Sequence, residues 1–380
     1  FIGFGTVGQG AVEILRDKAA MLRDRYGFEA QVVAVTTLRK GGLYQRDGLN
    51  LDALLTAIGS GSLAHYPEAP DLIRDMDALA TIQHTGADVI IEVSYTDLST
   101  AEPALSYCRA AFEAGKSVIT ANKGPIALAF AELTALAKSK RAFFGYEGTV
   151  MSGQPTLRLA SEALAGCTIT GVRGILNGTT NYMLTQMEAG RSYADVLSEA
   201  QRLGYAEADP TADVDGFDAA AKAAILAGLA FHTQVIDEDV YREGIRAITA
   251  DDVSVAKAMG FVIKLLAIAE ANELHGSKEE TISVRVHPTM IPTTHPLASV
   301  REAFNAVFVK CESAGELMFY GRGAGGTATA SAILGDLVAV ARNRNEGSLG
   351  PTETDYADLD IAPIGVSRTR YLIRMDVADV

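Results

Sequence analysis

Phe1-Ile-Gly3-Phe-Gly5-Thr6-Val7-Gly8-Gln-Gly10 is the stretch of sequence that decides the fold. Its glycines fit the spacing G-x-G-x-x-G, between a short apolar strand and a helix pattern that runs over residues 11–25. Glycines so spaced permit a tight turn and the close approach of the backbone to a pyrophosphate, toward which the helix directs its first N–H groups. We therefore predict a dinucleotide site formed by Gly3, Gly5, Thr6, Val7 and Gly8.

Apolar strands and helix patterns alternate after this loop. The expected strands cover residues 1–4, 31–36, 87–93, 117–120 and 142–146, and the expected helices 51–58, 71–79, 102–114 and 126–138. Strands that are apolar along their whole length and alternate with helices are typical of parallel βαβ units covered on both faces. The predicted fold class is therefore α/β, with a Rossmann-type parallel-sheet domain that binds the nucleotide over residues 1–150.

A different pattern begins near Pro155. Helices are expected at 155–164, 179–189, 192–203, 217–232, 237–248 and 250–259, and strands at 168–176, 262–271, 281–292 and 303–320. Helices segregated from an open sheet indicate a second domain of α+β type over residues 151–326. The glycine-rich link 321–326 opens a helix at 327–343, which we assign to the first domain, and a polar linker follows from residue 344.

Composition argues against several classes of function. The 380 residues carry a formal net charge of −14 and are 48% hydrophobic, so the chain can bury a core but favours neither nucleic acid nor an anionic membrane surface as a partner. No apolar run reaches the length that spans a bilayer, and no signal peptide is visible. The three cysteines are far apart, which suits a reducing cytoplasm, and the six histidines show no zinc-ligand spacing.

The end of the second expected strand bears on the choice of cofactor. A site for NAD usually has an Asp or Glu there, which binds the ribose hydroxyl groups. This chain instead has Thr36-Thr37-Leu38-Arg39-Lys40, with two cations and no carboxylate. Arg39 and Lys40 would attract the additional 2′-phosphate of NADP, so we predict a preference for NADP, with NAD as the alternative cofactor. The alternative is a solvated basic loop.

An acidic segment precedes a nearly unbroken apolar helix pattern. Five carboxylates lie between Glu207 and Asp218, and Lys222 follows within the helix expected at 217–232. Asp218 and Lys222 are four residues apart and therefore share a helix face. A lysine held beside carboxylates can act as a proton donor, whereas the alternative is an exposed ion pair that contributes little.

Five further motifs occur in a fixed order along the chain. They are Thr120-Ala-Asn122-Lys123-Gly-Pro125, Gly174-Ile-Leu-Asn177-Gly178-Thr179-Thr180-Asn181-Tyr182, Leu203-Gly204-Tyr205-Ala-Glu207-Ala-Asp209-Pro210, Arg285-Val-His287-Pro288 and Gly323-Ala-Gly325. Together they resemble the homoserine dehydrogenase family. The resemblance runs from Phe1 to about Arg344. It implies reduction of aspartate 4-semialdehyde to L-homoserine with NAD(P)H, on the route to threonine, methionine and isoleucine. It also implies that the second domain is catalytic and forms a homodimer or a dimer-based oligomer.

The resemblance further implies roles for individual residues. Negative charge grows on the aldehyde oxygen during hydride transfer and must be met by a proton or a cation. Lys222 is the expected proton donor, Lys123 its electrostatic partner, and Asp218 the carboxylate that holds Lys222. The expected contacts of the substrate are Glu207 and Asp213 for its ammonium group, Gly178 and Thr179 for its carboxylate, and Tyr205. The remaining expected contacts of the cofactor are Ser94, Asn122, Lys123 and Gly323.

One segment, Glu147-Gly-Thr-Val150-Met-Ser152-Gly-Gln154, corresponds to a stretch that binds a monovalent cation in the family. The resemblance implies Na⁺ held by Glu147, Val150, Ser152 and Gln154, mainly through backbone carbonyl oxygens, which suit a hard cation. The alternative is a plain hinge between the two domains.

The tail and the competing functions complete the expectations. Arg368-Thr-Arg370-Tyr371-Leu-Ile-Arg374-Met-Asp376-Val alternates like a strand and resembles the first strand of an ACT regulatory module; the alternative is a terminal strand of the catalytic domain. The competing enzyme is another NAD(P)-dependent amino-acid or semialdehyde dehydrogenase. A nucleotide-sensing protein without catalysis is the competing binding protein, and the Asp218–Lys222 pair argues against it.

Overall fold

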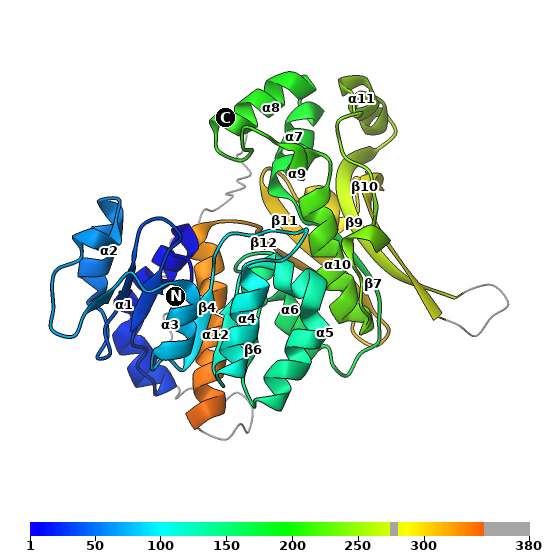
Figure 1. Cartoon of the computed structure of the whole chain (residues 1–380). Coiled ribbons are helices and arrows are strands. Elements are labelled where there is room, and N and C mark those ends of the chain that lie inside the picture. The colour runs from blue at the N-terminus through cyan, green and yellow to red at the C-terminus, as the bar shows by residue number, and fades with distance from the viewer. Residues whose placement is uncertain (274–279, 346–380) are drawn as a thin grey trace, which may run out of the picture.

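The computed structural model describes residues 1–273 and 280–345, which form two units (Figure 1). The first unit surrounds a parallel sheet and the second a large mixed sheet. The chain leaves the first unit after residue 145 and returns to it in its last described helix. The strand expected near 370–377 lies outside the described residues. None of the described helices is both long enough and apolar enough to cross a membrane.

The first unit is built on a parallel sheet with the strand order β4-β5-β6. Ile2 forms parallel bridges with Thr36 of β1 and with Glu92 of β4, so the opening residues lie between these two strands. β1 pairs antiparallel with β2, and β2 with β3. The strands are β1 (Ala34–Thr36), β2 (Gly42–Tyr44), β3 (Ile73–Arg74), β4 (Val89–Glu92), β5 (Ser117–Thr120) and β6 (Phe144–Gly145).

Helices cover both faces of this sheet because successive strand residues point to opposite sides. Ile91 and Ile119 belong to the apolar cluster of α1 and α12, whereas Ile90 and Val118 belong to that of α4 and α5. The helices of the first unit are α1 (Thr6–Tyr26), α2 (Leu51–Gly59), η1 (Leu63–His65), α3 (Ala78–His84), α4 (Ala104–Glu113), α5 (Lys123–Ser139) and α12 (Gly326–Asn345).

Helix α12 returns from the second unit and packs along α1 (Figure 1). Glycines allow the two helices to approach closely. A Cβ atom on Gly326 would lie 2.9 Å from the carbonyl oxygen of Thr6, and one on Gly10 would lie 3.4 Å from the Cβ of Ala330. The last helix therefore closes the core beside the glycine loop.

The second unit is built on a sheet with the order β12-β11-β7-β9-β10-β8. Its pairs are antiparallel except β10 with β8. Along β9, Ile263 and Leu265 face the cluster that holds α7 and α10, whereas Leu266 and Ile268 face the opposite side. The strands are β7 (Ile169–Ile175), β8 (Tyr241–Arg242), β9 (Phe261–Glu273), β10 (Glu280–Pro292), β11 (Phe304–Cys311) and β12 (Gly315–Arg322).

Helix α10 is the central helix of the second unit. Its sequence is rich in alanine and leucine, most of its residues are buried, and Lys222 is buried with them. The turn before it contains Gly216 at φ +82°, a conformation that favours glycine. The other helices of this unit are η2 (Glu147–Thr149), α6 (Thr156–Arg158), η3 (Leu159–Ala163), α7 (Gly178–Glu188), α8 (Tyr193–Arg202), α9 (Thr211–Val214), α10 (Phe217–Phe231), η4 (Asp237–Asp239), α11 (Ala250–Ala258) and η5 (Pro296–Ser299).

The predicted fold class is confirmed, but several expected elements are wrong. No helix spans 71–79, because Asp71 and Asp75 adopt left-handed backbone angles and β3 lies between them; α3 begins after its Asp77 cap. The helix expected at 237–248 is the single turn η4 followed by β8, which pairs with β10. The segment 303–320 is two strands joined by a turn, and 155–164 combines a helical turn with a π-helix.

Candidate active site

The glycine loop has the geometry of a phosphate-binding turn. Gly3 adopts φ +91°, and a Cβ atom on it would lie 2.4 Å from the carbonyl oxygen of Val93. Gly5 faces open space, so a ligand can reach its backbone. Gly8 packs against the ring of Phe4, where a Cβ atom would be tight at 3.1 Å. Thr6 and Val7 form the first turn of α1, whose N–H groups point into this space.

Arg39 and Lys40 lie in the turn that follows β1, close in the sheet to Gly3. The backbone N–H of Gly3 donates to the carbonyl of Thr36, the last residue of β1. Both cationic residues are exposed. The backbone N–H of Lys40 donates to the hydroxyl of Thr37, which fixes the turn. The two cations are therefore exposed in the turn that follows the strand beside Gly3, without an ion-pair partner among the described residues.

Two lysines from different units meet at one carboxylate. Lys123 is the first residue of α5, and its Nζ lies 3.4 Å from Oδ1 of Asp218. Lys222 lies one turn after Asp218 on α10, and its Nζ donates to Oδ2 of Asp218 at 2.7 Å. Lys222 also donates to the carbonyl of Leu176 at 2.8 Å. An ammonium group has three donors, so one donor of Lys222 has no partner among the described residues.

The charge of Asp218 is fixed by these neighbours. Burial opposes ionisation of the carboxyl, but the ammonium groups of Lys222 and Lys123 outweigh it and hold the pKa of Asp218 below its usual range. Asp213 differs, because burial raises its pKa and the negative charge of Asp218 acts in the same direction. The cluster therefore holds one firmly ionised carboxylate and one whose charge is disfavoured.

Asn177 joins the two carboxylates and was not assigned a role from the sequence. Its Nδ2 donates to Asp213 at 2.7 Å and to Asp218 at 3.1 Å. Its Oδ1 accepts the backbone N–H of Thr180 and caps the start of α7. The available signal was an Asn before Gly-Thr-Thr, which is typical of an N-cap. The pattern could not show that the same amide also reaches the acidic segment.

The other expected contacts of the substrate lie around this cluster. Gly178 and Thr179 form the first turn of α7, and the hydroxyl of Thr179 donates to the carbonyl of Tyr205 at 2.6 Å. The ring of Tyr205 lies 5.0 Å from that of Tyr182 and is half exposed. Glu207 is exposed, two residues further along the loop. The structure thus brings α7, the loop 203–210 and α10 to one place.

Ser94 and Asn122 follow β4 and β5 at the same edge of the sheet, and the backbone of Ser94 lies against Gly3. Asn122 caps α5 by accepting the N–H of Gly124, and its Nδ2 donates to the carbonyl of Tyr95. Ser94 donates through its N–H and its hydroxyl to the buried Glu92. The carboxyl ends of parallel strands are the usual place for ligands in such sheets.

The link 321–326 carries Gly323 from the second sheet to α12. A Cβ atom on Gly323 would overlap the amide of Asn305, at 1.9 Å from its Nδ2, so the position requires glycine. Both amide atoms of Asn305 are buried without a partner among the described residues.

The segment 147–154 connects the two units. The carboxylate of Glu147 accepts the backbone N–H groups of Leu157 and Arg158, and its own N–H donates to Asp336 of α12. Burial raises the pKa of Glu147, and the two N–H groups oppose this. The carboxylate is therefore committed to the start of α6, so a ligand would meet the backbone rather than this side chain.

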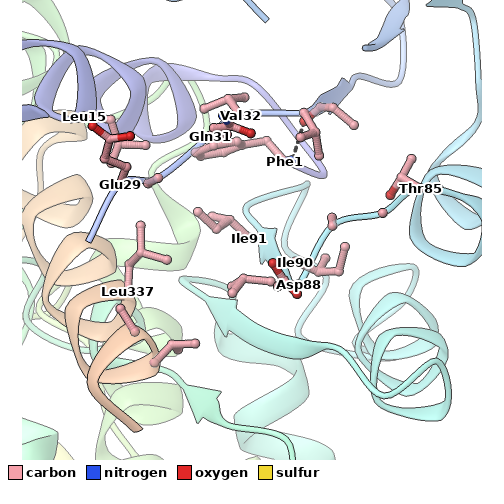
Figure 2. Close-up of a pocket in the computed structure, with 18 of the residues that line it drawn as sticks. Phe1, Leu15, Glu29, Gln31, Val32, Thr85, Asp88, Ile90, Ile91 and Leu337 are labelled. Atoms are coloured by element: carbon pink, nitrogen blue, oxygen red, sulfur yellow. Dashed lines mark hydrogen bonds between the residues drawn. The ribbon is translucent and has the colours of Figure 1, made fainter. Parts of the chain in front are cut away.

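A sizeable cavity of the first unit lies elsewhere. It has a volume of about 550 Å³ and is lined by Phe1, Ala34, Val89 and Leu337, among others (Figure 2). Phe1 and Val89 stand at the amino ends of the parallel strands, whereas Gly3, Ser94 and Asn122 follow their carboxyl ends. We therefore place the candidate site by its chemistry and not by cavity size. No group of His, Cys, Asp and Glu suited to a metal ion occurs among the described residues.

Comparisons with known proteins agree with this arrangement. The profile of the homoserine dehydrogenase catalytic domain matches residues 155–338, and that of the homoserine dehydrogenase NAD-binding domain matches residues 3–147. A homoserine dehydrogenase of Corynebacterium glutamicum is 45% identical over all of this chain and 79% of its own length. An NAD(+)-dependent homoserine dehydrogenase of Pseudomonas canavaninivorans is 42% identical over 89% of this chain and 94% of its own.

A solved homoserine dehydrogenase of Thiobacillus denitrificans superposes with a TM-score of 0.76 and 38% identity, over 90% of this chain and 72% of that one. With the glycine loop, the closing helix and the two lysines in place, the chain belongs to the homoserine dehydrogenase family, whose members are NAD(P)-dependent oxidoreductases.

Proposed function

We propose that the enzyme interconverts aspartate 4-semialdehyde and L-homoserine, with Lys222 as the proton donor. The observation that carries this assignment is the carboxylate of Asp218 held between Lys222 and Lys123. When bound, the nicotinamide supplies the hydride that reduces the aldehyde carbon. The free N–H of Lys222 gives its proton to the aldehyde oxygen, and Lys222 recovers a proton from water.

Asp218 keeps Lys222 oriented during this step. It accepts a hydrogen bond from Nζ of Lys222, while Leu176 accepts a second one, so the third N–H has a fixed direction. Lys123 adds positive charge at the other carboxylate oxygen of Asp218 and stabilises the developing oxyanion.

The remaining polar groups suit an amino-acid substrate. Glu207 and Asp213 would bind the ammonium group, and the N–H groups of Gly178 and Thr179 would bind the carboxylate at the start of α7. Tyr205 would cover the bound substrate from the loop. These assignments explain why the acidic segment adjoins a helix N-terminus.

The test is oxidation of L-homoserine by the purified enzyme, followed by absorbance of the reduced cofactor, with NAD and NADP in parallel. We expect turnover with L-homoserine and little with L-serine or L-threonine. Equal turnover of other amino alcohols would favour a different amino-acid dehydrogenase. Cofactor binding without turnover would favour a nucleotide-sensing protein.

We further propose a preference for NADP. Arg39 and Lys40 are exposed in the turn after β1, with no carboxylate at the end of that strand. The relative from Pseudomonas canavaninivorans is named as NAD(+)-dependent, so the two cofactors must be compared directly in this enzyme.

A monovalent cation, Na⁺, would fit the segment 147–154. Met151 and Ser152 both adopt left-handed backbone angles, at φ +61° and +57°, which are unfavourable for side chains with a Cβ atom. Among the described residues, no donor reaches the carbonyl oxygens of Val150 and Ser152, and Oε1 of Gln154 is buried without a partner. Oxygen atoms that accept no hydrogen bond suit a hard cation or a water molecule bound to it.

Replacing sodium chloride by choline chloride at constant ionic strength tests this cation. We expect the thermal midpoint and the activity to rise with Na⁺ and to saturate. Identical values in the two salts would exclude a structural cation at this segment.

We also propose a cytoplasmic dimer in which residues 1–150 with 327–343 bind the cofactor and 151–326 are catalytic and dimeric. Tyr320 on the edge strand β12 and Met290 on β10 are exposed, which favours contact through this sheet. Light scattering of the purified enzyme would measure the mass of the assembly, and a monomer at all concentrations would contradict the proposal.

A further inference from the structure

Glu92 is a buried carboxylate to which the mechanism above gives no role. Glu92 is the last residue of β4 and is 0% exposed. It has no cationic partner among the hydrogen bonds and ion pairs of the described residues. A carboxylate buried without a cation is costly unless several donors converge on it, and it then marks a position that requires an acceptor.

Three donors, from the loop after β4 and from the end of β5, do converge on Glu92. Its Oε1 accepts the backbone N–H of Ser94 at 2.8 Å and the hydroxyl of Ser94 at 2.5 Å. Its Oε2 accepts the hydroxyl of Thr120, the last residue of β5, at 2.8 Å. The carboxylate therefore ties the loop after β4 to the end of β5.

The connection continues from Thr120 to the start of α5. The hydroxyl of Thr120 accepts the backbone N–H of Asn122 at 2.9 Å. Asn122 caps α5 and donates to the carbonyl of Tyr95 at 2.9 Å, which returns to the loop after β4. Hydrogen bonds and chain segments thus form a closed ring through Glu92, Ser94, Tyr95, Asn122 and Thr120. Lys123 is the residue that follows Asn122 in the chain.

Both segments held by this ring adjoin the proposed active site. The loop after β4 contacts the glycine loop, since Gly3 leaves no room for a Cβ atom against Val93. The start of α5 presents Lys123 to Asp218 at 3.4 Å. A shift in the ring would therefore move one wall of the cofactor crevice and one of the two lysines together.

We infer that Glu92 is a positioning residue which, through Ser94 and Thr120, sets the distance between the cofactor loop and Lys123. The inference rests on the proposed role of Lys123. Reactions that depend on close alignment lose rate steeply when a group is misplaced, by up to ~10²-fold for a shift of 1 Å.

The decisive variant is Thr120→Val, because it removes the bridging hydroxyl with almost no change in shape. Its matched control is Thr81→Val, at a buried threonine of the same unit whose hydroxyl pairs with that of Thr36. Both changes delete one buried hydroxyl, so both lower stability. We expect only Thr120→Val to lower kcat, by ~10-fold or more, and to raise the kinetic isotope effect on hydride transfer from deuterated cofactor.

Glu92→Gln and Glu92→Ala extend the test. Gln keeps an acceptor for Ser94 but presents an N–H₂ group to Thr120, so its kcat should lie between those of the wild type and Glu92→Ala. If Glu92→Ala does not fold, Thr120→Val and Glu92→Gln still test whether Glu92 positions the two segments. A Thr120→Val enzyme with the kcat and isotope effect of Thr81→Val would overturn the inference.

Lys123→Ala separates this inference from the proposed function. Full activity of Lys123→Ala would remove the proposed role of Lys123 itself. Loss of activity in Lys123→Ala, together with an unchanged kcat in Thr120→Val, would refute only the positioning role of Glu92.

Discussion

At the scale of single residues, Lys222 carries the clearest prediction. Lys222→Ala should lower kcat by about 10²–10⁴-fold, the usual contribution of a general acid, and leave the Kd of the cofactor nearly unchanged. Steady-state kinetics and fluorescence titration of the reduced cofactor measure the two quantities.

Lys116 provides the matched control for Lys222. It is buried to the same degree, and its Nζ also donates to a backbone carbonyl, that of Thr85 at 2.8 Å. Lys116→Ala should lower stability without lowering kcat. A Lys222→Ala enzyme that keeps more than half of the native kcat would remove Lys222 from the reaction.

Two glycines of the same loop should respond differently to one methyl group. Gly3→Ala places a Cβ atom 2.4 Å from Val93 at a left-handed φ and should destabilise the fold by more than about 1 kcal/mol. Gly5→Ala meets open space and should keep the thermal midpoint but raise the Kd of the cofactor several-fold. Unchanged cofactor affinity in a folded Gly5→Ala enzyme would place the pyrophosphate elsewhere.

At the scale of elements, the turn after β1 sets the expected choice of cofactor. Replacing Arg39 and Lys40 by Gln should raise KM for NADP much more than for NAD, because only NADP carries the 2′-phosphate. Kinetics with both cofactors at saturating homoserine measure the ratio. Parallel changes in the two KM values would show that these cations do not face the phosphate.

Elements with one dominant signal were predictable from the sequence, and those made by pairing were not. β4, β5 and α10 are mainly apolar, and the burial of their apolar residues follows from that pattern. β8 is two residues long and exists because β10 lies beside it, so local preference could not reveal it. The same holds for the break at Asp71 and Asp75, where backbone angles decided against an apparent helix pattern.

The candidate site shows the same limit. The spacing of Asp218 and Lys222 on one helix was visible, and the structure pairs them. The contact of Lys123 with Asp218 joins residues 95 positions apart, and motif resemblance rather than spacing suggested it. Asn177 and Glu92 act through contacts made only after folding, so neither was assigned from the sequence.

At the scale of the whole molecule, Asp336 links α12 to the segment between the units. It accepts hydrogen bonds from the N–H of Glu147 and from Arg158. Burial raises the pKa of Asp336 from 3.8 to about 6. Between these values the folded state binds more protons than the unfolded one, so this contribution to stability is present below about pH 4 and is lost as pH rises through 6.

Asp336→Asn should remove that dependence. The free energy of unfolding of the native enzyme should fall, relative to that of Asp336→Asn, by up to ~1.4 kcal/mol per pH unit as pH rises from about 4 to 6. Denaturant unfolding at a series of pH values measures it. Parallel stability profiles for the two proteins would show that Asp336 titrates normally.

The return of α12 to α1 has a consequence for the synthesis of the chain. The core beside the glycine loop needs Ala330, Ile333 and Leu337, which leave the ribosome long after α1. About 300 residues separate the two helices, which at ~5–20 residues per second amounts to roughly 15–60 seconds of translation. During that interval the apolar face of α1 that α12 covers in the folded enzyme remains exposed. A nascent chain of this enzyme should therefore need chaperones most while its second sheet is being synthesised.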